Sequence, residues 1–501
     1  MSDLGKERRV VGSQTDVLLT HSYHLPYDQK QMRKMSPYSP IGTLYAASAL
    51  QAKDISVAVF DPMLEEPITG IARALERHRP RIVAIYEDDF NFLSKMCLTR
   101  MREVAFMIAA AARQAGAAVI AHGSDATDNA RLFLDNDVDY ILQGEAEETL
   151  AELCSTLLRS EPVSDIAGLV RLDAQKHLAY SSQRHSRNPE WAALAAPSRS
   201  LIDLEPYRKA WKQAHGYFSM NMAASRGCPF HCNWCAKPIS GNKFHLRPAK
   251  EVAEEMRQLK VEAQAEHVWF GDDIFALNHN WVQEFAVEVK ARDASVPFKI
   301  QSRADLMSES TVAALKLAGC AEVWMGVESG SQKILDAMDK RLKLSAVVTA
   351  RRRLQRAGIR ACYFLQFGYP GERWEELQET IAFVRRTRPD DIGISFSYPL
   401  PGTIFYQRVQ AELGAKRNWA DSDDLCIMFK AAYTSSFYRA VRDALHAEVS
   451  NWYSGGIGKN SYIEEQWQSV YALEPVSRNA ESTELPSGLF PVSELIAARG
   501  I

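Results

Sequence analysis

Short apolar runs alternate with amphipathic stretches from residue 16 onward. Between residues 97 and 115, Met101, Val104, Ala105 and Ile108 follow the i, i+3, i+4, i+7 spacing of an apolar helix face. The apolar runs have the composition of buried strands: DVLLT (16–20), SVAVFD (56–61), RIVAIYE (81–87), AVIAHG (118–123) and DYILQG (139–144). We therefore predict an α/β domain over residues 12–160, a doubly wound Rossmann-like parallel sheet with right-handed crossovers.

The segment after this domain is less regular. Pro162, Pro189, Pro197 and Pro206 interrupt it repeatedly, as in a connector. We predict a linker over residues 161–214.

The alternation resumes after residue 215, where helical segments such as 250–263 and 308–318 separate six more apolar runs. These are SMNMAA (219–224), HVWF (267–270), FKIQS (298–302), EVWMGV (322–327), RACYFLQF (360–367) and IGISFS (392–397). Six βα units predict a partial (βα)6 relative of the eight-fold α/β barrel over residues 215–405. In such barrels the chemistry lies at the carboxyl ends of the strands.

The tail over residues 406–501 has a weaker pattern. Thr434 or Ser435 is a suitable N-cap for a helix that carries Phe437, Val441, Leu445 and Val449 on one face, so we predict a mainly helical extension that packs against the barrel. For two aromatic residues in this tail, Trp452 and Tyr453, the alternatives are core packing and a pocket wall.

Composition narrows the class of protein. The 501 residues carry a net charge of −3, which gives no electrostatic reason to expect nucleic acid or an anionic membrane as partner. No apolar stretch approaches the roughly 20 residues of a membrane span, and the opening MSDLGKERRVVGSQ lacks the apolar core of a secretory signal. We expect a cytoplasmic protein with reduced cysteines.

Three of the eight cysteines crowd into CPFHCNWC, directly after the first strand of the second series. Soft thiolates suit zinc or an iron–sulfur cluster. A structural zinc site needs a fourth ligand, which His231 or His245 would have to supply. A cube held by Cys228, Cys232 and Cys235 alone would leave one iron open. Thiols without metal are the third alternative.

The motif resembles the C-x3-C-x-Φ-C signature of radical S-adenosylmethionine (SAM) enzymes, in which Φ is aromatic. Further stretches look like that family's strand-end motifs, in order: WFGDDIF (269–275), SRAD (302–305), GVESGSQKIL (326–335), FGYPGE (367–372) and YPLPGT (398–403). The first domain is similar to the cobalamin-binding domain that often precedes this barrel, through SPYSPIGTLYAASAL (36–50) and DYILQGEAEET (139–149). The resemblance covers most of residues 15–405.

This resemblance implies a 4Fe–4S cluster on Cys228, Cys232 and Cys235, with SAM on the open iron. Arg303 would pair with the methionyl carboxylate, and Glu328 would contact the ribose hydroxyls or the ammonium. The family's common Gly-Gly-Glu is replaced by Gly-Asp-Asp. The implied SAM-binding residues are Trp234, Asp272, Asp273, Arg303, Gly326, Glu328 and Gly368.

For cobalamin, the resemblance directs attention to loops beyond the carboxyl ends of the first sheet. The candidate residues there are Ser39, Gly42, Thr43, Asp88, Ser124, Asp125, Gly144 and Glu145. His21 and His24 follow the first strand without the Asp-x-His-x-x-Gly motif that supplies a histidine to cobalt, so cobalamin without a protein histidine is expected. The sequence HGSDA stands where the family often has Gly-Gly.

The implied activity is a cobalamin-dependent methyl transfer to an unactivated carbon of a small-molecule substrate, with an external one-electron donor such as flavodoxin or ferredoxin. Relatives that close or rearrange rings without methyl transfer are the alternative within the enzymes, and a non-catalytic cobalamin or iron–sulfur sensor is the alternative outside them. Methylthiotransferases need three more cysteines in the leading domain, where only Cys97 and Cys154 occur.

Overall fold

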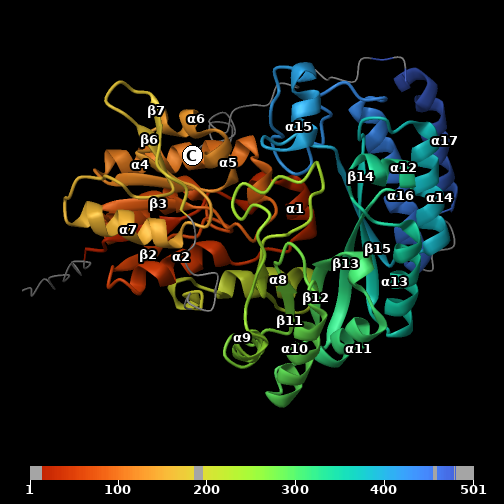
Figure 1. The fold of residues 1–501 in the computed structure, drawn as a ribbon, viewed down its shortest axis with the longest axis horizontal. Coiled ribbons are helices and arrows are strands. Elements are labelled where there is room, and N and C mark those ends of the chain that lie inside the picture. The colour runs from red at the N-terminus through yellow and green to blue at the C-terminus, as the bar shows by residue number, and fades with distance from the viewer. Residues whose placement is uncertain (1–13, 185–195, 455–459, 479, 481–501) are drawn as a thin grey trace, which may run out of the picture.

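The computed structural model describes residues 14–184, 196–454, 460–478 and 480, which form two α/β units and a helical extension (Figure 1). The first unit has a sheet in the order β2-β1-β3-β4-β5-β6-β7. Its first five strands are parallel, which confirms the doubly wound sheet. The strands are β1 (Val17–Thr20), β2 (Val57–Val59), β3 (Ile82–Tyr86), β4 (Ala118–His122) and β5 (Tyr140–Leu142). The helices between and after them are α1 (Gln29–Lys34), α2 (Ile41–Gln51), α3 (Pro67–His78), α4 (Thr99–Gln114), α5 (Ser124–Asp128), α6 (Ala130–Leu134) and α7 (Glu147–Leu158).

The expected linker over residues 161–214 contains regular structure. Strands β6 (Leu169–Leu172) and β7 (Leu178–Tyr180) form an antiparallel hairpin that extends the first sheet beyond β5. Further on, α8 (Glu205–His215) buries Tyr207 and Trp211 in the barrel core. Pro162 and Pro197 lie outside these elements, Pro206 lies in the first turn of α8, where proline is tolerated, and Pro189 lies outside the described residues. Each end of the segment thus packs with a different unit.

The second unit is an open barrel of six parallel strands, as predicted. The strand order β15-β14-β13-β12-β11-β8 follows the sequence order, so each strand pairs with its predecessor. The strands are β8 (Ser219–Met222), β11 (His267–Phe270), β12 (Phe298–Ser302), β13 (Cys320–Glu328), β14 (Arg360–Phe367) and β15 (Asp391–Phe396). The helices that cover them are α9 (Ala249–Val261), α10 (His279–Ala291), α11 (Glu309–Ala318), α12 (Gln332–Ala337), α13 (Leu344–Arg356) and α14 (Trp374–Thr387).

The C-terminal extension consists of α15 (Ile404–Val409), α16 (Ser435–Ser454) and α17 (Asn460–Arg478). Phe437, Val441 and Leu445 are completely buried in the barrel core, which confirms the predicted helix. Trp452 and Tyr453 do not line the cysteine end of the barrel. The Tyr453 hydroxyl donates to the carbonyl groups of Arg388 and Pro389, just before β15 begins, which is the opposite edge of the sheet.

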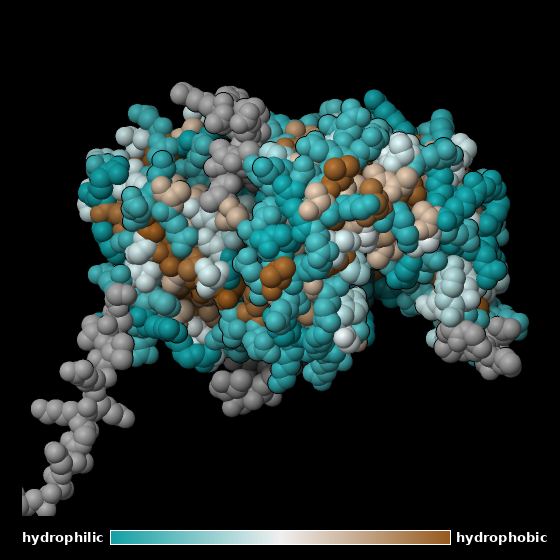
Figure 2. Space-filling view, turned by 90° about the horizontal axis from the view of Figure 1, so that it is seen from below, coloured by the Kyte–Doolittle hydropathy of each residue, from teal (hydrophilic) through white to brown (hydrophobic). Residues whose placement is uncertain are grey.

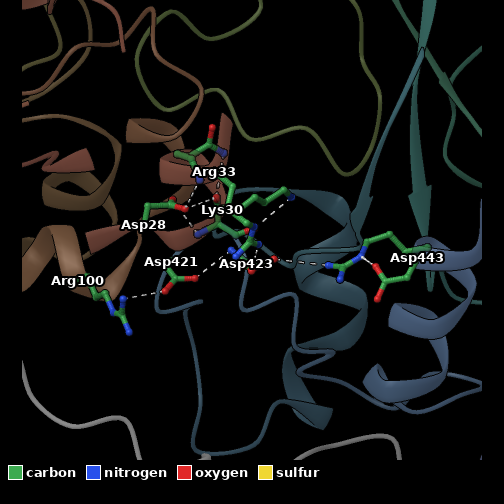
Figure 3. Close-up of polar contacts among 10 residues, drawn as sticks. Asp28, Lys30, Arg33, Arg100, Asp421, Asp423 and Asp443 are labelled. Atoms are coloured by element: carbon green, nitrogen blue, oxygen red, sulfur yellow. Dashed lines mark hydrogen bonds and ion pairs between the residues drawn. The ribbon is translucent and has the colours of Figure 1, made fainter. Parts of the chain in front are cut away.

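The extension also contacts the first unit, through a loop over residues 419–424 (Figure 3). Backbone amides at the start of α4 donate to the carbonyl groups of Trp419 and Ala420. The Asp28 carboxylate, 2% exposed, accepts from the Ser422 amide at 3.1 Å and from the Ser422 hydroxyl at 2.8 Å. Arg33 pairs with Asp423 at the surface, at 2.6 Å. These contacts hold the loop over residues 419–424 against the first unit.

Hydrophilic residues cover most of the face seen in Figure 2, and hydrophobic residues interrupt them in small groups. Among the helices that the structure describes, none combines the length and the apolar character that crossing a bilayer requires.

We predict that Asp28→Ala loosens the loop over residues 419–424, because two donors from Ser422 lose a buried carboxylate. Loss of hydrogen bonds to a charged group costs about 2 kcal/mol, so the Ser422 amide should exchange with deuterium roughly 30-fold faster. Arg33→Ala is the matched control, because its ion pair with Asp423 is exposed and should leave exchange unchanged. Equal exchange in Asp28→Ala and the parent protein would contradict this.

Candidate functional site

The three clustered cysteines lie on a loop over residues 227–244, which an antiparallel pair of short strands closes. These are β9 (Ser225–Arg226) and β10 (His245–Leu246), just beyond the carboxyl end of β8. Gly227 has a φ of +77°, and a Cβ there would lie 2.3 Å from the Lys243 carbonyl oxygen. Only glycine therefore allows the chain to enter the loop at this point.

Two side chains hold the loop in shape. Lys237 donates to the carbonyl groups of Cys228, at 2.8 Å, and of Phe230, and to the Asn242 side chain. Asn233, between the second and third cysteines, donates to the Ala337 carbonyl at 2.8 Å and accepts from the Tyr369 hydroxyl at 2.7 Å. The loop is thus tied to itself and to segments that follow α12 and β14. Lys237 lies outside the signature and Asn233 occupies one of its variable positions, so no sequence signal identified them.

The donor set fits a cluster better than a single ion. All three thiols are free, Cys228 and Cys232 are partly accessible, and Cys235 is exposed. In the described ranges, no three His, Cys, Asp or Glu side chains converge closely enough to bind one metal ion. This disfavours the zinc alternative, because tetrahedral ligands lie about 2.0–2.3 Å from one metal. Thiolates on different irons of a cube are farther apart.

The two aspartates after β11 have different partners. The Asp272 carboxylate is 1% exposed and accepts from the Ala224 amide at 3.0 Å and from the Ser225 hydroxyl at 2.5 Å. Burial raises the pKa of Asp272 to about 7, although these bonds oppose the shift. Asp273 is exposed and pairs with Lys95 of the first unit at 2.5 Å. Asp272 therefore fixes the base of the cysteine loop, and Asp273 contacts the other unit.

Arg303 follows β12 and is already paired. Its guanidinium binds both oxygens of Asp305 at 3.0 Å, donates to the Lys340 carbonyl at 3.1 Å and lies 3.9 Å from the centre of the Phe230 ring. Through its contact with Phe230, Arg303 supports the cysteine loop. A SAM carboxylate would have to share or displace Asp305.

Glu328 ends β13 with a φ of +64°, which is rare and strained outside glycine. Its carboxylate pairs with Lys340 at 2.7 Å, and both side chains are 7% exposed. A Cβ on Gly326 would lie 2.7 Å from the Glu328 carboxylate and 2.9 Å from Lys340, so glycine makes room for the pair. Lys340 also lies 6.0 Å from the Trp234 ring, whose Nε1 is buried without a partner in the described part of the chain. These four residues are brought together.

Gly368 follows β14 with a φ of +78°, and a Cβ there would lie 2.8 Å from Ile427 of the extension. Its amide donates to Glu372 at 2.6 Å. Glu372 is fully buried, its second oxygen has no partner among the described residues, and burial raises its pKa to about 8. Glu372 is part of the motif FGYPGE, but the sequence alone did not distinguish it from an ordinary acidic residue near the start of a helix.

In the first unit, four candidate residues have structural partners. Ser39 donates to the Asn221 side chain of β8 at 2.8 Å, and Asn221 donates back to the Ser39 carbonyl. The Thr43 hydroxyl donates to the Tyr86 carbonyl at 2.6 Å. Asp88 accepts from the Gly42 amide at 2.9 Å, and burial raises its pKa to about 6. Ser39 is therefore an inter-unit contact, and the others fix the start of α2.

The remaining candidates lie after β4 and β5. Ser124 is buried at the start of α5, and Asp125 is bound by Arg102 through both oxygens at 2.8 and 2.5 Å. Gly144 has a φ of +72° and accepts at its carbonyl from His122 Nε2 at 2.9 Å. Glu145 has a buried carboxylate oxygen with no partner in the described chain.

Two residues that we did not select share this unpaired character. Within the described residues, His122 Nδ1 and one Glu87 oxygen are buried without partners. Burial lowers the pKa of His122 to about 4, so the ring is neutral and Nδ1 is an acceptor. Both residues help line a small cavity with Cys97, Met101 and Ala126. They belong to the loops EDDF and HGSDATD at the strand ends, which was the available signal.

A buried ion pair joins the two units at the cysteine loop. Arg226 of β9 pairs with Glu147 of α7 at 2.5 Å, and the two side chains are 4% and 5% exposed. The guanidinium also lies 5.4 and 5.0 Å from the ring centres of Tyr45 and Phe90. The cysteines therefore face the carboxyl edge of the first sheet.

Comparisons with known proteins agree with this geometry. Residues 222–384 match the Radical SAM superfamily. An uncharacterised methyltransferase of Pyrococcus horikoshii is 25% identical over 76% of this chain and 80% of its own length. The anaerobic magnesium-protoporphyrin IX monomethyl ester cyclase of Rubrivivax gelatinosus is 24% identical over 56% of this chain, which spans about half the cyclase, 50%.

Among solved structures, the chain resembles the radical SAM methyltransferase TsrM of Kitasatospora setae, determined with cobalamin and a [4Fe-4S] cluster bound. The TM-score is 0.64 at 17% identity, over 80% of this chain and 75% of TsrM. At this identity the likeness supports the fold.

We predict that Glu372 makes the protein less stable as pH rises. The folded carboxyl keeps its proton up to about pH 8, whereas an unfolded glutamate loses it near 4.3, so the folded state binds more protons between these values. Between pH 5 and 7.5 the loss of stability should be about 3 kcal/mol. Glu372→Gln should flatten this slope in thermal unfolding. Glu375→Gln, at an exposed glutamate in the first turn of α14, should follow the parent protein, and an unchanged slope in Glu372→Gln would contradict the prediction.

Proposed function

We propose that the chain is a radical SAM enzyme with an N-terminal domain of the cobalamin-binding type, and that it methylates an unactivated carbon of a small-molecule metabolite. The observation that carries the proposal is the place of the three thiols. They follow the first barrel strand at its carboxyl edge, and Arg226 ties their loop to the carboxyl edge of the first sheet. Both edges therefore meet at one site.

Different residues of the barrel would bind the cluster and SAM. Cys228, Cys232 and Cys235 would hold the cluster, and Lys237 and Asn233 would keep their loop in place. The SAM site would lie beside Trp234 and the Glu328–Lys340 pair, for which Gly326 makes room. When bound, the cluster would supply the electron that cleaves SAM to methionine and a 5′-deoxyadenosyl radical, and cobalamin would carry the methyl group.

The first unit would supply hydrogen-bond acceptors. Glu87, His122 and Glu145 have buried acceptor atoms without partners in the described structure, at the carboxyl edge that faces the cysteines. Buried polar atoms are normally paired, so these atoms fit a ligand rich in N–H donors, such as the amide side chains of cobalamin. His122 would remain a neutral acceptor rather than a charged group.

The proposal is tested with protein purified and reconstituted without oxygen. We expect a 4Fe–4S signal in EPR and Mössbauer spectra, a bound corrinoid, and release of 5′-deoxyadenosine and S-adenosylhomocysteine with a competent substrate. Replacing Cys228, Cys232 and Cys235 by alanine should reduce cluster iron and 5′-deoxyadenosine to background. The control replaces Cys97 and Cys154, buried thiols of the first unit, and should keep both.

Different results would separate the alternatives. Turnover that yields 5′-deoxyadenosine without S-adenosylhomocysteine would replace methyl transfer by ring closure or rearrangement, the chemistry in the name of the cyclase relative. Bound corrinoid and cluster without any SAM cleavage, with all substrates tried, would favour a sensor.

A further inference from the structure

The barrel strands have two faces of different composition. The face towards the helices is apolar and fully buried, as at Ile300, Val323 and Ile394. Because side chains alternate along a strand, the positions between these residues point to the opposite face, the barrel interior. Barrels of this kind normally fill their interior with bulky branched aliphatic residues. On β13–β15, this interior face instead carries aromatic, glycine and polar residues: Trp324, Gly326, Phe364, Gln366, Gly393 and Ser395.

Strand register brings two aromatic rings together on this face. Phe364 pairs in register with Gly326 on one side and with Gly393 on the other. The rings of Trp324 and Phe364 stack, with centroids 4.7 Å apart and planes inclined by 27°. Both residues are only partly buried, unlike the aromatic residues on the helix side. We call Trp324 and Phe364 the aromatic platform.

Gly393 keeps the platform flat. A Cβ at this position would lie 3.2 Å from the Phe364 ring and 3.3 Å from the Trp324 ring. Such contacts are tighter than ordinary packing, so any side chain would push the rings into the interior. The glycine has a φ outside the left-handed region, so conformational freedom does not explain it. Its function in this fold is to let both rings lie on the sheet.

The first unit packs against the other half of the interior. Tyr38 lies against Trp269 of β11, with ring centroids 4.7 Å apart, and its hydroxyl bonds to Ser219 of β8 at 3.0 Å. The face of β13–β15 opposite α13 and α14 is turned towards the first unit (Figure 1). The platform therefore lies between the two units, in register with Gly326 of the expected SAM site.

A charged pair lies next to the platform. Glu322 lies two residues before Trp324 on the same face of β13. It pairs with Arg360 at 2.5 Å and accepts a hydrogen bond from the Trp324 indole nitrogen at 2.6 Å. The indole donor is thus used, and Trp324 offers its ring face. Lys299 of β12 lies in register with Glu322, and Asp391 of β15 lies in register with Cys362, so charged side chains also border this part of the described interior.

From this juxtaposition we infer that the aromatic platform binds a flat, unsaturated ring system of the substrate, and that Trp324 and Phe364 determine this specificity. The inference deepens the proposed function and rests on it for the identity of the bound molecule as a substrate. Stacking favours a planar ring over a saturated one because π faces attract in offset geometry, and such contacts add about 0.5–1.5 kcal/mol to area burial. The platform residues touch the ring and are binding residues, without a part in SAM cleavage.

The test compares two neutral probes of equal size, naphthalene-2-carboxamide and its fully saturated decahydro counterpart. Their dissociation constants are measured by saturation-transfer NMR on the anaerobic, cluster-loaded full chain. We expect the naphthalene amide to bind about tenfold more tightly than the saturated amide, which is about 1.4 kcal/mol. Trp324→Ala should remove this preference, and Gly393→Ala should weaken it while both rings remain.

Matched controls keep the inference falsifiable. Trp452→Ala removes a partly buried tryptophan on α16, at the other edge of the barrel, and should leave the preference unchanged. SAM binding, measured by equilibrium dialysis, should be unchanged in Trp324→Ala and Gly393→Ala. Thermal unfolding identifies a variant that has lost its fold, and Gly393→Ala then provides the independent measurement.

Three outcomes would overturn the inference: equal binding of the two probes, an equal effect of Trp452→Ala, or displacement of the naphthalene amide by SAM. The last outcome would assign the platform to the adenine ring. Because the readout is probe binding, the inference fails separately from the proposed function, which fails only when SAM cleavage or methyl transfer is absent.

Discussion

The buried ion pair between Arg226 and Glu147 is the contact on which the rest of the site depends. Both charges are almost inaccessible to water, and a buried charge without its partner costs about 3–5 kcal/mol. Neither unit can therefore bury its charge favourably alone. Because Arg226 lies two residues before Cys228, docking of the first unit also determines where the cysteine loop begins. Folding and site assembly are thus one event.

The same reasoning explains why the barrel is open and polar inside. Asn221 of β8 would be a poor interior residue in a closed barrel, but it forms reciprocal hydrogen bonds with Ser39 of the first unit. Tyr38 fills the space beside it. The first unit therefore completes one half of the interior with satisfied polar contacts. The other half, over β13–β15, carries the partly buried rings of Trp324 and Phe364.

Local patterns predicted the parts of the fold that depend on local sequence. Short apolar runs predicted both parallel sheets, and apolar residues at helical spacing predicted the buried face of α16. Both patterns are visible in the sequence because buried positions require apolar residues. The β6–β7 hairpin was missed, since its short strands gain their stability from pairing with β5. In the site, sequence located the strand ends but not the partners. Only the structure places Asp305 on Arg303 and Arg102 on Asp125.

These occupied partners separate two kinds of residue at the strand ends. Asp272, Arg303 and Asp125 form hydrogen bonds with other protein groups, and these bonds maintain the geometry of the loops. Trp234, Glu87 and His122 keep buried donor or acceptor atoms unpaired in the described structure, which costs stability unless a ligand restores the bond. Several such atoms lie along the carboxyl edges of the two sheets, so the free protein is less stable than it would be with these atoms paired. A bound cofactor that forms hydrogen bonds with these atoms would remove this cost and stabilise the folded chain.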